Sequence, residues 1–368
     1  MSKVKLGDVA IEHKETCGGS KDGYPIVGLE HLTPEEVTLT AWDEDSDNTF
    51  TKVFRKGNVL FGRRRAYLRK AAVAPFDGIC SGDITVIEAI PDRILPELLP
   101  FIIQNDGLFS FAVGKSAGSL SPRVKWEHLK NYEFELPSMD RQCELAELLW
   151  AMDTTKKSYQ KLIAATDELV KSQFMEQFGS YLGDETRCAT VEQVCTVFAD
   201  GDWIESKDQA DDGIRLIQTG NVGNGVYLDK GERARYIDEE TFARLNCTEV
   251  LPNDILISRL PDPVGRACII PDGLGKSITA VDCSIVRLKS HVLPEFFVAY
   301  TMTTLYAAQI GSSVTGSTRK RISRKNLGQV VIPTPDIDQQ EQFAAFVRQS
   351  DKSKFAIQSC SNLNLSGL

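Results

Sequence analysis

The sequence predicts an α+β protein built from two similar globular domains, with a long helix between them. Three observations predict this class. A series of short motifs occurs twice in the same order, and residues 138–178 contain neither Gly nor Pro. Short apolar strand signals are also mixed with helices without a regular strand–helix–strand alternation, which is typical of α+β proteins. A chain of 368 residues is long enough for two separate hydrophobic cores.

The repeat relates the first half of the chain to the second. Its motifs are short apolar strands, Pro-started helices and small-residue loops, and they recur at a nearly constant offset of roughly 185–199 residues. Three of the matched pairs are 54–63 with 250–259, 94–102 with 292–300, and 117–129 with 315–327. Because the order is kept throughout, we interpret the chain as two copies of one supersecondary unit.

Each copy is expected to contain four recognisable strands followed by a helix. The expected strands are 25–29, 58–62, 71–74 and 84–88 in the first copy, and 214–218, 254–258, 267–270 and 283–287 in the second. Pro at the first helical position predicts helices at 96–112 and 294–310.

The long helix is predicted over residues 138–178, where Ser138 caps its start and Gly179 ends it. At 1.5 Å per residue it would span about 60 Å. Its apolar residues follow the alternating three-four spacing of a coiled-coil seam, which Lys156 and Thr166 interrupt. A second, shorter helix starts after Thr334. The expected seam residues of the two helices are Leu145, Leu149, Met152, Tyr159 and Ile163, with Phe343, Val347 and Ile357.

These signals divide the chain into four segments. Residues 1–137 form the first globular domain and residues 138–182 the long spacer helix. Residues 183–333 form the second globular domain, and residues 334–368 the shorter helix and a polar tail.

Composition excludes several classes of protein. No apolar run is long enough to span a membrane, and the N-terminus has no apolar core of a signal peptide, so we expect a cytoplasmic protein. The nine cysteines form no C-x-x-C pair, and the four histidines are widely separated. The sequence therefore predicts reduced thiols and no metal site.

Positive charge is concentrated in one stretch of each half. The formal net charge of −9 argues against a nucleic-acid partner, but no Asp or Glu occurs at 48–76 or at 296–335. Lys and Arg neutralise phosphates, and Arg also reads guanine edges. The candidate DNA-binding residues are Arg63, Arg64, Arg65, Arg69, Lys70, Lys115, Ser119, Arg123 and Lys125 in the first half, and Arg259, Arg266, Ser317, Thr318, Arg319, Lys320, Arg321, Arg324 and Lys325 in the second.

Catalytic motifs are missing from the sequence. The segment 273–277 reads GLGKS, but the preceding glycine of a phosphate-binding loop is replaced by Ile270. A nuclease cluster of Asp262, Asp272 and Lys276 is an alternative, although all three lie at turn-like positions beside Pro or Gly. The sequence thus favours a non-catalytic binding protein, with a stand-alone DNA nuclease as a weaker alternative.

The duplicated order resembles the specificity subunit of type I restriction–modification enzymes. The resemblance covers essentially the whole chain and rests on two small-residue loops, 117–123 and 315–321, each followed by a Leu, a strand and Pro. After each Pro comes a helix that carries Gln, at Gln142 and at Gln339 and Gln340. The resemblance implies two target-recognition domains separated by long helices that form an antiparallel coiled coil, with approximate two-fold symmetry.

The same resemblance implies the partners. Each domain would read one half of an asymmetric, bipartite site in double-stranded DNA, and the chain would join two methyltransferase subunits and motor-nuclease restriction subunits. S-adenosylmethionine, ATP and Mg would belong to those partners, with no cofactor in this chain. A helix-tethered adaptor that binds only protein is the alternative, and it predicts that changing the basic loops leaves DNA binding intact.

Overall fold

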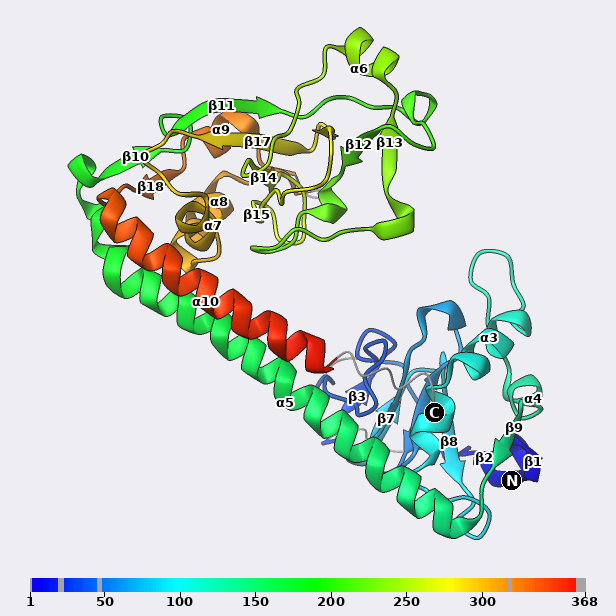
Figure 1. Ribbon diagram of the computed structural model, residues 1–368. Helices are drawn as coiled ribbons and strands as arrows, with labels where there is room; N and C mark the ends of the chain where they lie inside the picture. Colours follow the sequence, from blue (N-terminus) through cyan, green and yellow to red (C-terminus); the bar gives the residue numbers. More distant parts are fainter. Residues whose placement is uncertain (1, 19–22, 45–47, 317–319, 362–368) are drawn as a thin grey trace. The chain divides into compact units, whose positions relative to one another are not determined.

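The computed structural model describes residues 2–18, 23–44, 48–316 and 320–361, without the side chains of Ser2 and residues 357–361. The chain forms two compact units (Figure 1). Unit 1 consists mainly of Met1–Tyr159, and unit 2 of Gln160–Cys360. The long helix α5, Met139–Phe178, contributes to both. The fold class is confirmed: strands and helices are mixed in each unit, and the sequence placed the long helix to within one residue.

Unit 1 contains three small sheets. Their strand orders are β2-β8-β5-β6, β3-β7-β4 and β1-β9. The strands are β1 Ser2–Lys5, β2 Ala10–Glu12, β3 Ile26–Val27, β4 Lys52–Phe54, β5 Val59–Gly62, β6 Ala71–Val73, β7 Gly78–Cys80, β8 Ile84–Ala89 and β9 Glu133–Leu136. The helices are α1 Leu6–Val9, η1 Ala66–Leu68, α2 Leu99–Ile103, α3 Asp106–Gly114 and α4 Trp126–Leu129.

Unit 2 repeats this arrangement. Its orders are β11-β17-β14-β15, β13-β12-β16 and β10-β18. The strands are β10 Cys188–Thr190, β11 Cys195–Asp200, β12 Ile214–Ile217, β13 Arg235–Ile237, β14 Ile255–Ser258, β15 Ala267–Ile269, β16 Ser277–Thr279, β17 Cys283–Leu288 and β18 Val331–Pro333. The helices are η2 Gly179–Gly183, η3 Glu185–Arg187, η4 Ser206–Asp208, η5 Thr219–Asn221, η6 Gly231–Arg233, α6 Glu239–Leu245, α7 Pro294–Thr301, α8 Thr304–Ser313, α9 Arg324–Gly328 and α10 Ile337–Ser361.

The two units differ in their three-stranded sheets. In unit 1, β7 pairs with β3 in parallel and with β4 in antiparallel orientation. In unit 2, β12 pairs with β16 in parallel, but its second neighbour is β13, which leads into α6. The second copy therefore extends the shared sheet with a hairpin-and-helix segment of its own.

The single helix expected at 96–112 is wrong, and so is the one expected at 294–310. Each is two helices, α2 with α3 and α7 with α8. The Asn105 side chain accepts a hydrogen bond from the Gly107 backbone N–H and starts α3. Thr303 accepts one from Tyr306 and starts α8. These capping residues begin a new helix because their side chains satisfy a backbone donor that a continuous helix would pair internally.

A buried glutamine joins the start of each spacer helix to its unit. Gln142, 2% exposed, accepts a hydrogen bond from the Leu95 backbone N–H and donates to the Pro137 carbonyl. Gln340, 0% exposed, accepts from Leu293 and donates to the carbonyls of Pro335 and His291. The duplication seen in the sequence thus extends to individual hydrogen bonds.

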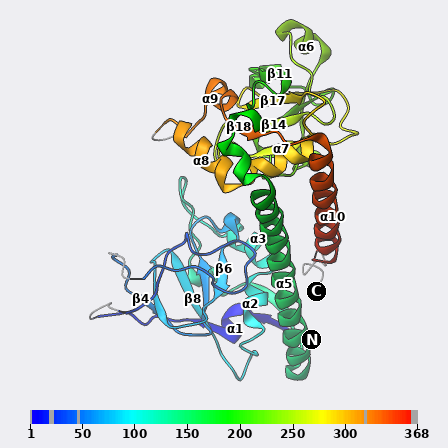
Figure 2. The ribbon, with the colours of Figure 1, turned by 90° about the vertical axis from the view of Figure 1, so that its left-hand side faces the viewer.

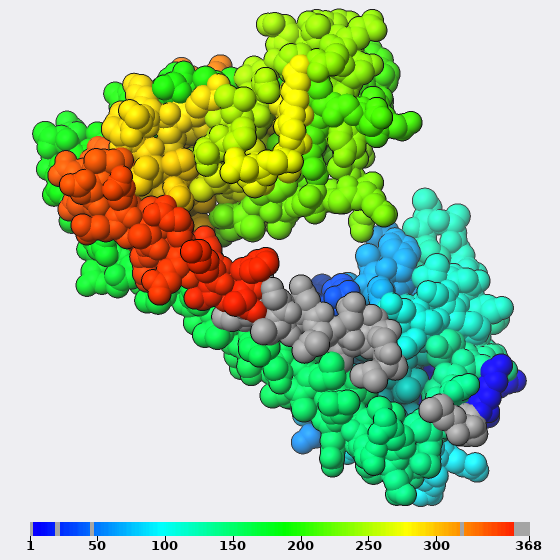
Figure 3. Space-filling view, viewed as in Figure 1, coloured from blue at the N-terminus to red at the C-terminus, as the bar shows by residue number. Residues whose placement is uncertain are grey.

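The second half of α5 pairs with α10 inside unit 2. Phe174 lies 5.4 Å from Phe343 between ring centroids, and Lys354 Nζ lies 2.8 Å from Asp167 Oδ1. Residue numbers rise along α5 while those of their α10 partners fall, so the two helices are antiparallel. They lie side by side in the ribbon, and the space-filling view shows α10 along the surface of α5 (Figures 1 and 3).

An aromatic cluster fixes this helix pair to unit 2. Phe174 contacts Phe178, Phe296, Tyr300 and Phe343, with ring centroids 5.0–5.6 Å apart. Phe174 is 1% exposed. Buried aromatic side chains contribute large apolar areas, so this cluster supplies much of the stability of the pair.

The expected seam has two different environments. Leu149 is buried and Leu145 partly buried, and both pack on α2 with Leu98 (Figure 2). That part of the seam therefore anchors α5 to unit 1. Met152, Tyr159 and Ile163 are half-buried. Phe343 and Val347 pack into the unit 2 core, whereas the side chain of Ile357 lies outside the described residues.

Candidate nucleic-acid interface

In each unit the fold brings two basic segments together. In unit 1, the Arg63 backbone N–H donates to the Asp83 carbonyl, and Val124 N–H donates to the Arg63 carbonyl. In unit 2, the Arg259 backbone N–H donates to the Asp282 carbonyl, and the Ile322 N–H donates to the Arg259 carbonyl. The end of the strand β5 or β14 therefore lies beside the small-residue loop that precedes α4 or α9.

The small-residue loop is closed in the same way in both units. Ala117 and Arg123 exchange backbone hydrogen bonds of 3.0 and 2.9 Å. Thr315 and Arg321 exchange two of 2.9 Å. Gly118 has φ +117° and Gly316 has φ +98°, a region that only glycine adopts readily. The loops are thus held by their ends, and glycine is required at their first turn.

An aspartate lies at the base of each loop. Arg123 donates from Nε to Asp83 Oδ1 at 2.7 Å and from Nη2 to Oδ2 at 3.3 Å. Arg64 Nη1 lies 3.5 Å from the same carboxylate. The hydrogen bond from Arg123 holds the pKa of Asp83 below its usual range. In unit 2, Arg321 Nη2 lies 3.3 Å from Asp282 Oδ1. These aspartates orient the arginines, and sequence reasoning missed them because an isolated Asp gives no signal.

Several predicted residues of unit 1 face solvent around this loop. Arg65, Lys115, Ser119 and Lys125 are exposed, and Arg63 is half-buried. Lys115 Nζ lies 5.7 Å from the centre of the Phe111 ring. Together with Arg64 and Arg123 they form a basic surface on which a phosphate backbone could lie. We call these residues the unit 1 basic surface.

Other basic residues of unit 1 are held by internal partners. Arg69 forms an ion pair with Asp106, and its guanidinium carbon lies 5.6 Å from the Phe109 ring centre. Lys70 Nζ donates to the Leu29 carbonyl at 2.6 Å. Arg69 and Lys70 therefore have partners within unit 1, and their contacts with DNA remain predictions.

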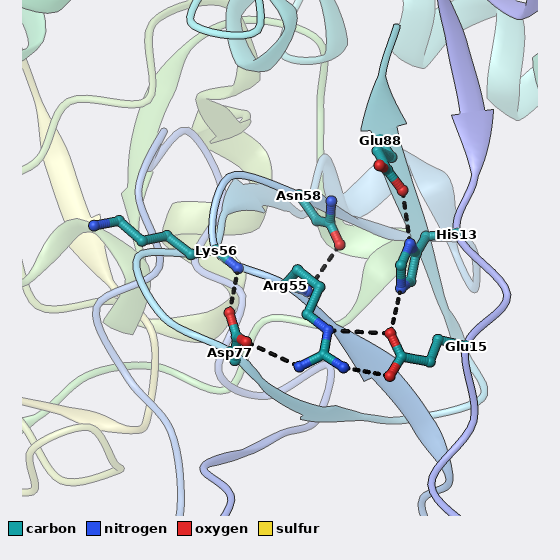
Figure 4. A network of polar contacts seen from close by, with 7 residues as sticks. All are labelled: His13, Glu15, Arg55, Lys56, Asn58, Asp77 and Glu88. Atoms are coloured by element: carbon teal, nitrogen blue, oxygen red, sulfur yellow. Dashed lines mark hydrogen bonds and ion pairs between the residues drawn. The ribbon is translucent and has the colours of Figure 1, made fainter.

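A polar network also occupies Arg55, which lies in the acid-free stretch (Figure 4). Its guanidinium pairs with Glu15 and with Asp77, and Glu15 in turn contacts His13, which bonds to Glu88. Arg55 lowers the pKa of Glu15, and the Lys56 backbone N–H followed by Arg55 lowers that of Asp77. The charge of Arg55 is therefore neutralised by protein carboxylates.

Two predicted contacts in unit 2 are turned inward. Arg259 is only 4% exposed, donates to the Val281 carbonyl, and lies 3.4 Å from Asp200. Burial lowers the pKa of Arg259. Arg266 donates to the backbone carbonyls of Val222, Leu260, Pro263 and Thr219. The Arg266 guanidinium thus uses most of its donors inside the protein, and Arg259 is buried beside Asp200, so both side chains have internal partners in this structure.

The remaining unit 2 candidates surround the second loop. Lys320, Arg321, Arg324 and Lys325 are exposed. Arg324 Nη1 donates to the Phe198 carbonyl at 2.8 Å, which fixes its direction. Ser317, Thr318 and Arg319 lie outside the described residues.

One residue of the nuclease alternative is paired with a side chain outside the proposed cluster. Lys276 Nζ lies 2.6 Å from Glu239 Oε2. In the part of the chain that the structure describes, no group of three His, Cys, Asp or Glu side chains could hold a metal ion. Across the same described ranges, no helix is both long enough and apolar enough to cross a membrane.

Comparisons with known proteins agree with this arrangement. Residues 186–364 match the family model for the type I restriction modification DNA specificity domain. The chain is 20% identical over 373 residues to the putative type I restriction enzyme MjaX specificity subunit of Methanocaldococcus jannaschii, covering 95% of this chain and 84% of that one. It is 25% identical over 183 residues to the type I restriction enzyme EcoDI specificity subunit of Escherichia coli, covering 49% and 37%.

A solved structure shares the fold. A chain from the work on complex assembly and conformational transition of the type I R-M system aligns with a TM-score of 0.52 at 19% identity. The alignment covers 98% of this chain and 92% of that one.

A duplicated α+β unit with a basic loop in each copy, separated by a long helix, defines a two-domain recognition protein. Its second half, residues 186–364, matches the model of the type I restriction modification DNA specificity domain, and over 95% of its length the chain is similar to a type I restriction enzyme specificity subunit.

Proposed function

We propose that the chain is the DNA-recognition subunit of a type I restriction–modification complex, and that each unit reads one half of a bipartite site. The observation that carries this proposal is the repeated junction of a strand end with a closed basic loop, at Arg63 with Val124 and at Arg259 with Ile322. A protein with two similar readers suits two half-sites on one DNA molecule.

The two half-sites should differ in sequence. The unit 1 basic surface includes Arg63, Arg64 and Arg65 after its strand, whereas the matching strand in unit 2 is followed by Arg259, Leu260 and Pro261. Base-edge contacts depend on individual side chains, so these readers present different donors to DNA. The proposed target is therefore asymmetric.

The exposed face of α5 offers a docking surface for the methyltransferase subunits. Leu162 and Leu169 are 50% and 49% exposed and lie one heptad apart. Ala165, between the two leucines, and Ser172, beyond Leu169, are also exposed. This uncharged stripe lies beside the antiparallel pair with α10 and suits partner helices packed at coiled-coil spacing.

The chemistry would lie in the partners. In this proposal the chain is a non-catalytic subunit, like the specificity subunits to which it is related. Two methyltransferase subunits would bind S-adenosylmethionine, motor-nuclease subunits would use ATP and Mg, and the complex would act on DNA in the cytoplasm.

Mapping of methylated bases tests this function. Cells without a background methylation system would express the chain together with its methyltransferase partner. We expect methylation at one asymmetric, bipartite sequence that disappears when the chain is omitted. Methylation that is unchanged without the chain, or that follows a single continuous site, would contradict the proposal.

Charge changes separate this function from the protein-binding adaptor. A variant with Arg63→Gln, Arg64→Gln and Arg65→Gln should weaken DNA binding by the assembled complex and flatten its salt dependence. Arg55→Gln is the matched control, since Arg55 is already neutralised by Glu15 and Asp77. Unchanged DNA binding in the triple variant would favour the adaptor.

A further inference from the structure

The loop that closes the unit 1 basic surface has an apolar side chain at its tip. Leu120 is 90% exposed, far more than Tyr67 at 55% or Leu68 at 40%. The loop follows α3 and projects from the rest of unit 1 in the ribbon (Figure 1). Single exposed leucines are common on protein surfaces, so exposure alone assigns no role to Leu120.

The loop holds this leucine by backbone contacts on both sides. Ala117 and Arg123 pair through their backbones, and the Arg65 N–H donates to the Pro122 carbonyl at 2.8 Å. The Arg64 guanidinium donates to Ser121 Oγ, next to Leu120. Leu120 is thus carried on a short loop whose ends pair with each other and whose residues Ser121 and Pro122 are bound to the residues after β5, with Gly118 at the turn before it.

The chain segment around Leu120 is cationic. No Asp or Glu occurs between residues 107 and 126, while Lys115, Arg123 and Lys125 lie in that segment. The nearby Asp83 is paired with Arg123 and Arg64, and Asp106 with Arg69. Duplex DNA has apolar, stacked base pairs between two negatively charged phosphate backbones. An apolar side chain surrounded by basic residues is therefore complementary to DNA.

We propose that Leu120 is an apolar wedge that enters a DNA groove and opens a base step in the half-site read by unit 1. Leu is among the side chains that proteins insert between base pairs, where partial unstacking and bending are offset by wider backbone contact. Arg63, Arg64 and Arg65 would hold the phosphates beside the opened step. Leu120 would thereby add specificity, because base steps differ in the energy needed to deform them. This inference rests on the proposed function.

The matching position in unit 2 carries a different residue. The repeat aligns Leu120 with Thr318, which lies outside the described residues. Because Thr is polar, the wedge would belong to the unit 1 half-site alone. The proposal therefore predicts DNA distortion on one side of the bipartite site.

The test uses the full chain assembled with its methyltransferase subunits and duplexes carrying the mapped site. 2-Aminopurine replaces each adenine of the unit 1 half-site in turn, and its fluorescence reports unstacking. The wild-type complex should raise the fluorescence at one step. Leu120→Ser should abolish that rise and weaken binding to the specific duplex about tenfold, the size of effect expected for one lost base-pair readout. Binding to an unrelated duplex should stay unchanged.

Two variants make the result specific. Leu120→Met keeps an apolar side chain and should retain both the fluorescence rise and the affinity. Ile11→Ser, at a 47% exposed position on β2, removes an exposed apolar side chain elsewhere in unit 1 and should behave as wild type.

Several outcomes overturn the wedge. One is a Leu120→Ser complex that unstacks and binds DNA as wild type does. Another is failure of that variant to assemble with the methyltransferase in the absence of DNA, which would make Leu120 a protein contact. If the wild-type complex binds no specific duplex at all, the proposed function fails, and this is distinguishable from either result.

Discussion

Arg63 of unit 1 and Arg259 of unit 2 occupy the same place in the repeat and have opposite surroundings. Each follows a central strand, donates its backbone N–H to an aspartate carbonyl, and accepts from the residue after the small-residue loop. Arg63 is half-buried at the edge of a basic surface, whereas Arg259 is 4% exposed and lies 3.4 Å from Asp200. The backbone arrangement is duplicated, but the use of the side chain is not.

This difference shows how one fold could read two DNA sequences. The hydrogen bonds that hold the loop use backbone atoms and are therefore insensitive to side-chain changes. Side chains at the strand end are free to face DNA or to stabilise the domain. The matched positions of the two units thus offer pairs of substitutions with opposite expected effects.

The largest effect on stability is expected in the aromatic cluster of unit 2. Phe174→Ala should lower the free energy of unfolding of that unit by about 3–5 kcal/mol, since it removes a ring 1% exposed. Leu149→Ala, on the unit 1 part of α5, should lower the free energy of unfolding of unit 1 by about 2 kcal/mol, the lower end of the range for Leu→Ala substitutions in a core. Leu169→Ala, on the exposed face, should change stability by less than about 0.5 kcal/mol. Hydrogen exchange followed separately in peptides of each unit measures the effects.

If Phe174→Ala destabilised unit 2 no more than Leu169→Ala does, α10 would not be held by the aromatic cluster. The antiparallel pairing would then need another source of stability.

The next effect distinguishes Arg259 from Arg63. Arg259→Met leaves Asp200 with one partner fewer and the Val281 carbonyl without its donor, so unit 2 should lose about 2–3 kcal/mol. Arg63→Met should change the stability of unit 1 by less than about 0.5 kcal/mol but weaken DNA binding. Denaturant unfolding and a binding titration on the same two variants provide the comparison. Equal effects of the two substitutions on both measurements would show that burial does not separate their roles.

The buried glutamines should give a smaller, graded effect. Gln340 makes hydrogen bonds to one backbone N–H and two carbonyls, whereas Gln142 makes one of each kind. We expect Gln340→Ala to cost about 2–3 kcal/mol in unit 2 and Gln142→Ala about 1–2 kcal/mol in unit 1, because buried backbone groups are left unsatisfied. Gln339→Ala, at the exposed neighbouring position, is the control. The reverse order of the two costs would contradict the account of how these helices are attached.

The smallest effect concerns acid stability. Arg123 lowers the pKa of Asp83 in the folded protein, so the charged pair stabilises unit 1 fully above the unfolded-state pKa of about 4. That contribution should be lost as pH falls through the lower folded-state pKa. The stability difference between wild type and Asp83→Asn should be below about 1 kcal/mol at pH 6 and should shrink as the pH falls below about 4. A stability difference that grows as the pH falls would contradict this account of the Asp83–Arg123 pair.

The sequence predicted the elements that depend on local pattern. The long helix was expected at 138–178 and occurs at Met139–Phe178, since an uninterrupted run without Gly or Pro leaves few alternatives. The strands expected at 84–88 and 283–287 occur at Ile84–Ala89 and Cys283–Leu288, because apolar runs of that length suit buried strands. The helix breaks at Asn105 and Thr303 were missed although both are capping residue types.

The basic site was predicted less completely, for a physical reason. A lysine or arginine in the sequence carries the same charge whether it faces solvent or a carboxylate from a distant strand. Arg55, Arg259 and Arg266 are paired or hydrogen-bonded with residues brought close only by folding. Leu120 was also missed, because the motif that surrounds it was identified from its Gly, Ser and Arg residues.

An exchange of unit 2 tests the central claim, that two copies of one fold read two independent half-sites. Residues 183–333 would be replaced by the corresponding domain of a relative whose target sequence is known, and the methylated sites would be mapped in cells. The account predicts that one half-site changes to that of the donor while the other half-site stays the same. A methylated sequence that is unchanged, or in which both halves change, would contradict it.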